Sequence, residues 1–140
     1  MMSAFIAGKL KLARAHLESA RRNLQDGDRE TASNRAFLAA ESAAAALIAK
    51  AGRRVPPVHD RIRSQFEELC DKGKIPYKFR SILNESYRLR LRGDYGRRFM
   101  RRRAIPDLTS KVVQDMIDRV SDLVAATETI VRTRRSSAGP

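Results

Sequence analysis

Two histidines are the only side chains in this chain that suit proton transfer near neutral pH without help from their surroundings. His16 lies within an amphipathic stretch, which is typical of a surface or boundary residue. His59 follows Pro56 and Pro57 at an expected helix start. A histidine there can serve as a helix cap or as a general base, and both interpretations stay open. His59 is therefore the candidate catalytic histidine.

Arginines gather in one short part of the chain, with eight of them between positions 88 and 103. Arginine binds phosphate through a planar fork of N–H donors, which lysine lacks. Tyr95 and Phe99 lie among these arginines, and aromatic rings stack on the bases of single-stranded RNA. A solvated basic loop explains any single arginine equally well. The cluster as a whole predicts a nucleic-acid-binding surface formed by Arg88, Arg92, Arg97, Arg98, Arg101, Arg102 and Arg103.

Arg90, Asp94 and Tyr95 complete the candidate catalytic residues. Cleavage of RNA by its own 2′-hydroxyl requires a base, and a cation near the charge that develops on the phosphate. Arg90, with Arg92 close by, can supply that positive charge. His59 is the candidate base, with Asp94 or Tyr95 as the alternative if the arginines favour its ionised form.

The excess positive charge is concentrated in one segment. The 140 residues include 29 Lys and Arg against 16 Asp and Glu, a formal net charge of +13. Residues 77–103 hold ten basic and two acidic side chains, so more than half of the excess lies there. A charge of this size points to a polyanionic partner, and the arginines make RNA the expected one.

Several classes of function are excluded by what the sequence lacks. Cys70 is the single cysteine, so an internal disulfide is impossible, and no Cys/His cluster has zinc spacing. Gly93 and Gly96 do not follow a strand, which argues against a phosphate-binding glycine loop. We therefore expect neither a metal nor a cofactor. The apolar runs are too short to span a membrane and no signal peptide is recognisable, so a cytoplasmic protein with no membrane contact is expected.

Apolar residues recur every three or four positions through most of the chain, which is the period of an amphipathic helix. Five helices are expected, over about residues 6–24, 29–51, 59–70, 79–93 and 108–127. Residues 94–106 are expected to form an irregular basic loop, or at most a short helical turn. The second helix is rich in alanine and is expected to be central. The predicted fold is all-α, an up-and-down four-helix bundle with an additional helix. Residues 1–131 form this single domain, and residues 132–140 form a basic, disordered tail.

Six short pieces follow one another in a characteristic order along residues 13–96. They are Ala13-Arg14, Asp26-Gly27-Asp28, Asn34-Arg35-Ala36, His59, Gly73-Lys74-Ile75-Pro76 and Arg90-Leu91-Arg92-Gly93-Asp94-Tyr95-Gly96. In this order they resemble HEPN domains. The resemblance is closest to the small bacterial and archaeal HEPN proteins that are often encoded beside a minimal nucleotidyltransferase.

This resemblance implies a HEPN-like helical bundle that forms a homodimer. Many members of the family are metal-independent, RNA-cleaving toxins. Their nucleotidyltransferase partner acts as the antitoxin, in some systems by AMPylating the HEPN protein. The resemblance therefore implies such an antitoxin as a partner here, and it makes Tyr95 a candidate for modification. In a symmetric dimer, the two copies of residues 90–95 are expected to line one groove.

Two features depart from the family pattern. Phe37 and Leu38 stand where two aromatic residues usually follow Asn-Arg-Ala. The ribonuclease motif of active members, an arginine followed four to six residues later by a histidine on a late helix, is absent because no histidine follows His59. Two alternatives therefore stand beside the RNA-cleaving toxin. One is a non-catalytic HEPN module that binds nucleic acid or nucleotide, and the other is a structural protein that docks an acidic partner.

Overall fold

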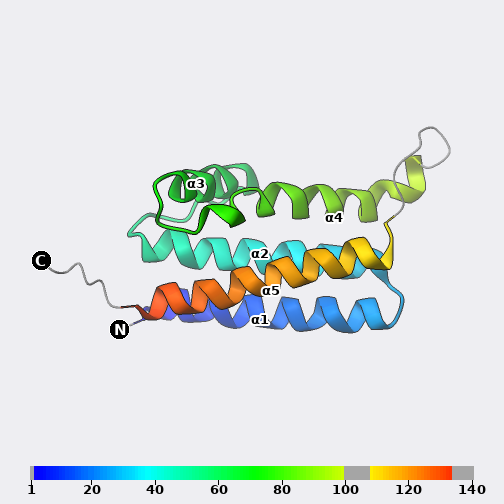
Figure 1. The fold of residues 1–140 in the computed structure, drawn as a ribbon, viewed down its shortest axis with the longest axis horizontal. Helices are drawn as coiled ribbons and strands as arrows, with labels where there is room; N and C mark the ends of the chain where they lie inside the picture. Colours follow the sequence, from blue (N-terminus) through cyan, green and yellow to red (C-terminus); the bar gives the residue numbers. More distant parts are fainter. Residues whose placement is uncertain (1, 100–107, 134–140) are drawn as a thin grey trace, which may run out of the picture.

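The computed structural model describes the backbone of residues 2–99 and 108–133, and the side chains of residues 2–92 and 108–133. Helices α1, α2, α4 and α5 run alternately up and down, and the shorter α3 packs beside α2 (Figure 1). The predicted all-α, up-and-down bundle with an additional helix is confirmed. The elements in chain order are α1 (Ala4–Gln25), α2 (Arg29–Lys50), α3 (His59–Asp71), the 3₁₀ turn η1 (Tyr77–Phe79), α4 (Ile82–Phe99) and α5 (Ser110–Arg132).

Helix α2 lies at the centre of the bundle and contacts α1, α3, α4 and α5. Its alanines are buried on several sides of the helix, so the neighbouring helices approach closely, as the composition predicts. Phe37 and Glu41 have larger side chains than the alanines around them in α2, and both point toward α3 and α4. These two residues form the inner part of the candidate site described below.

Local signals define the helix ends. Gly27 after α1 and Gly52 after α2 adopt φ angles of 84° and 82°, a region that side chains other than glycine rarely occupy. Thr109 caps the start of α5, because its hydroxyl oxygen accepts a hydrogen bond of 3.1 Å from the backbone N–H of Val112. These three helix ends therefore follow from turn and capping residues that are visible in the sequence.

Helix α4 differs from the sequence prediction at both ends. The sequence predicts one helix over residues 79–93, but η1 occupies the beginning of that stretch and α4 starts at Ile82. The helix then continues through Gly93 and Gly96 to Phe99, so the prediction that it ends near Gly93 is wrong. The rest of the stretch predicted as a loop or short helical turn, residues 100–106, lies outside the described residues. A glycine weakens a helix by about 1 kcal/mol but keeps its backbone N–H, so unlike proline it leaves the hydrogen-bond ladder intact.

Candidate active site

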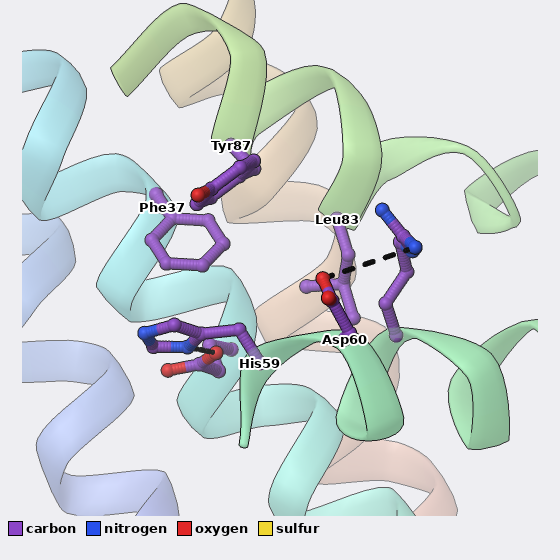
Figure 2. Close-up of a pocket in the computed structure, with 7 residues that line it drawn as sticks. Phe37, His59, Asp60, Leu83 and Tyr87 are labelled. Atoms are coloured by element: carbon purple, nitrogen blue, oxygen red, sulfur yellow. Dashed lines mark hydrogen bonds and ion pairs between the residues drawn. The ribbon is translucent and has the colours of Figure 1, made fainter. Parts of the chain in front are cut away.

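The candidate site is built around the ring of Phe37, which is only 2% exposed. The ring of Tyr87, from α4, meets it edge to face, with centroids 5.4 Å apart and planes at 61°. The ring of His59, from α3, lies 5.5 Å away at 70°. Figure 2 shows the three rings gathered between α2, α3 and α4. Edge-to-face contacts of this kind favour one mutual orientation of the rings.

His59 is the first residue of α3, and its side chain is 52% exposed. Its Nδ1 is hydrogen-bonded to a carboxylate oxygen of Glu41, whose side chain is 17% exposed. A carboxylate can only accept hydrogen bonds, so Nδ1 must carry the proton that is donated. In the neutral ring, Nε2 then keeps its lone pair. Glu41 therefore holds His59 as the tautomer that can accept a proton at Nε2, as a general base must.

Arg90, from α4, reaches the same aromatic ring. The central carbon of its guanidinium lies 5.3 Å from the centroid of Phe37, which is a cation–π distance. The ring centre of His59, the predicted base, and the guanidinium carbon of Arg90, the predicted cation, both lie within 5.5 Å of the centre of the Phe37 ring. The separation between His59 and Arg90 can therefore be no greater than the sum of these two distances. Three helices that are separated in sequence place these two groups around one buried side chain.

A small cavity opens beside the His59 ring. It has room for about one water molecule, so it cannot admit a nucleotide in this form. At its rim, a guanidinium nitrogen of Arg63 lies 3.9 Å from Asp60, and another lies 3.5 Å from the amide oxygen of Asn84. A substrate would therefore meet His59 from its exposed side. The cavity is lined by Phe37, Glu41, His59, Asp60, Arg63, Leu83 and Tyr87.

Arg88 and Arg92 lie on the opposite side of α4 from Arg90. They line a groove between α4 and α5, whereas Tyr87 and Arg90 face α2. The separation follows from helix geometry, because residues two positions apart are turned by about 200° about the axis. These two members of the predicted nucleic-acid-binding set therefore do not share a face with the His59 site.

The other predicted site residues lie outside the described side chains, and their roles stay predictions. Four of them belong to the backbone of α4, which runs to Phe99. These four are Asp94, Tyr95, Arg97 and Arg98, while Arg101, Arg102 and Arg103 fall between the two described ranges.

Glu41, Arg63 and Tyr87 were not among the predicted site residues. Glu41 carries a signal that sequence reasoning can use, because it is the one charged residue between Arg35 and Lys50. A lone carboxylate in a helix expected to be buried calls for a partner, since unpaired buried charge is costly. Tyr87 and Arg63 carry no comparable signal, because their role depends on how α3 and α4 meet.

His16, the second histidine, has different surroundings. It is partly buried on α1, and burial, followed by the charge of Arg35, lowers its pKa. No acidic partner is hydrogen-bonded to it among the residues whose side chains the structure describes. Replacing His16 is therefore a suitable control for replacing His59.

Within residues 2–92 and 108–133, no group of three or more His, Cys, Asp or Glu side chains is placed to hold a metal ion. None of the described helices combines the length and the apolar character needed to cross a membrane.

The fold and the site define a class of protein: an α-helical bundle that presents a carboxylate-bound histidine and an arginine around a central aromatic ring. A family model for the HEPN domain matches residues 9–130, and the chain belongs to the HEPN family. Domains of this family have nucleotide- and RNA-related roles. A comparison with curated proteins finds no match. The family match confirms the resemblance to HEPN domains and extends it over α5.

Proposed function

We propose that this HEPN domain binds RNA and cleaves it without a metal ion, with His59 as the general base and Arg90 as the stabilising cation. One observation carries the proposal: His59, hydrogen-bonded to Glu41, and Arg90 meet at the ring of Phe37. A base of fixed tautomer and a nearby cation are the two groups that attack of a ribose hydroxyl on its neighbouring phosphate requires.

In the proposed reaction, Nε2 of His59 removes the proton of a ribose 2′-hydroxyl, and the 2′-oxygen attacks the adjacent phosphorus. The bond from phosphorus to the 5′-oxygen of the next nucleotide breaks, and that oxygen takes a proton from water. The products are a 2′,3′-cyclic phosphate and a 5′-hydroxyl. Glu41 stabilises the protonated form of His59, and Arg90 stabilises the charge on the phosphate oxygens.

The RNA backbone is proposed to continue over the basic residues that follow Arg90 in the chain. The support is their density in the sequence, because phosphate contacts from arginine supply most of the affinity in sequence-independent binding. This part of the proposal rests on Arg97, Arg98, Arg101, Arg102 and Arg103.

Family membership supports three further parts of the proposal. We propose that the protein acts as a toxin in the cytoplasm, that it works as a homodimer, and that a minimal nucleotidyltransferase is its antitoxin. Tyr95 is the proposed site of modification by that partner. The support for these parts is the resemblance of residues 13–96 to the toxin-like members of the family.

A non-catalytic HEPN module that binds RNA or nucleotide is the second candidate, and the small size of the cavity favours it. With room for about one water, the space between His59 and Tyr87 admits no nucleotide unless side chains move. In this case the bond between His59 and Glu41 only fixes the start of α3, and RNA is bound without being cut.

Binding and cleavage of a labelled RNA in EDTA distinguish these candidates. We expect the affinity to fall steeply with salt concentration and cleavage products to accumulate. Arg90→Ala should slow cleavage about a hundredfold, because it removes a group that stabilises the developing charge. Arg61→Ala, a change to an exposed arginine on α3, is the matched control. Salt-dependent binding without cleavage supports the second candidate, and no binding at all overturns both.

A further inference from the structure

A second surface lies between α4 and α5, away from the His59 site. The floor of this groove is apolar: Leu89 is 3% exposed, Met116 is 7% exposed and Val112 is 37% exposed. The groove holds about 320 Å³ of open space. Its walls carry charged side chains of both signs, namely Glu85, Arg88, Arg92, Asp115 and Arg119.

The acidic residues of the groove are already paired, whereas two of its arginines are not. Arg119 donates a hydrogen bond of 2.7 Å to Glu85, and this contact lowers the pKa of Glu85. Asp115 lies 3.2 Å from the ammonium group of Lys111. Among the described residues, Arg88 and Arg92 form no ion pair. The charge of Arg88 also contributes to the lowered pKa of Glu85. The groove therefore offers two arginines that form no ion pair within the described part of the chain.

The chemistry of the groove suits a protein segment better than RNA. Its floor is aliphatic and offers no ring on which a base can stack. An apolar centre bordered by charges of both signs is typical of a protein interface. Arg88 and Arg92 are one helical turn apart, which matches two acidic residues one turn apart on a facing helix.

We propose that this groove binds an acidic amphipathic helix of another protein. Its apolar side chains would cover the floor, and two of its carboxylates would pair with Arg88 and Arg92. The net charge of +13 favours an acidic partner over a basic one. Because the groove and the His59 site lie on opposite sides of α4, a partner bound here leaves the candidate catalytic groups uncovered. The inference does not depend on RNA cleavage.

The test uses the full chain and a synthetic alanine-based helical peptide. The peptide carries leucines three and four residues apart on one face and two glutamates one turn apart beside them. We expect this peptide to bind the protein. Its affinity should fall about tenfold for the double variant Arg88→Ala/Arg92→Ala, and about tenfold when glutamines replace the glutamates of the peptide. Val112→Glu, a change at an exposed position of the floor, should also weaken binding. Arg61→Ala on α3 should leave it unchanged.

Four results would overturn the inference. The first is no peptide binding, and the second is equal binding of the glutamate and glutamine peptides. The third is a double variant that keeps its affinity for the peptide but loses affinity for RNA, which would assign Arg88 and Arg92 to the RNA. The fourth is a dimer of the protein that dissociates in the double variant, which would assign the groove to a second copy of the chain.

Discussion

Replacing Glu41 by glutamine tests whether the carboxylate acts through His59. Glutamine has nearly the same shape and keeps an oxygen that accepts the hydrogen bond from Nδ1 of His59. What it removes is the negative charge beside the imidazole ring. If His59 takes a proton during cleavage, the ring becomes positively charged at that moment, and the lost carboxylate would have stabilised it.

The expected size of the effect follows from the exposure of the pair. A hydrogen bond to a charged group contributes about 1.5–3 kcal/mol. The side chain of His59 is 52% exposed, so water screens part of the interaction and the lower end of that range applies. A change of about 1.5 kcal/mol in the barrier is about tenfold in rate. We therefore expect Glu41→Gln to cleave RNA about ten times more slowly than the unaltered protein.

Initial rates over a range of RNA concentrations measure this effect. The loss should appear in kcat with KM unchanged, because Glu41 stabilises a charge that forms only during the reaction. The double variant Glu41→Gln/His59→Ala should be no slower than His59→Ala alone. Glu18→Gln, at an exposed carboxylate on α1, is the matched control. Cleavage by Glu41→Gln at the unaltered rate, or a loss that adds in full to that of His59→Ala, would refute the reasoning.

Three further predictions concern single side chains. Phe37→Ala should lower the free energy of unfolding by about 3–5 kcal/mol in urea titrations, because the ring is 2% exposed. Phe37→Leu should keep most of the stability but still slow cleavage. A loss below 1 kcal/mol for Phe37→Ala would show that the ring is not packed as described. The hydrogen bond from Arg14 holds the pKa of Glu128 below its usual 4.5. Above pH 4.5 this pair therefore stabilises the folded state, by under about 1 kcal/mol. The contribution is lost as the pH falls through the lowered pKa of Glu128. Arg14→Gln should remove this acid-sensitive part, and an unchanged pH dependence of urea unfolding would speak against the pair. Burial raises the pKa of Cys70 to about 11. Its thiol should therefore react with an aromatic disulfide reagent at pH 7.5 only after denaturation. Rapid labelling of the folded protein would contradict the burial of Cys70.

The positions of the helices could be predicted from the sequence because each depends on local information. The apolar period identifies α1 and α5, and the alanine content of α2 predicts its central place. Gly27 and Gly52 mark the turns that follow α1 and α2. The course of α4 could not be predicted in the same way. A glycine permits a turn without requiring one, so Gly93 left the end of this helix open.

The candidate site was only partly predictable, because its geometry depends on how three helices pack. Residue type alone identified His59 and Arg90 as a base and a cation. That both lie around Phe37 could not be read from the sequence, because the three residues belong to three different helices and Phe37 and Arg90 are more than fifty residues apart in the chain. The same limit applies to the arginine cluster. Clustering in sequence suggested one surface, whereas the helical turn places Arg88 and Arg92 on the other side of α4 from Arg90.

The most direct test of the proposed ribonuclease site is single-turnover cleavage of RNA in EDTA by the unaltered protein, His59→Ala and His16→Ala. The unaltered protein should release fragments that end in a 2′,3′-cyclic phosphate. His59→Ala should be at least about a hundredfold slower, in keeping with the loss of a general base, while His16→Ala should cleave at the unaltered rate. Cleavage by His59→Ala at the rate of the unaltered protein would contradict the proposal.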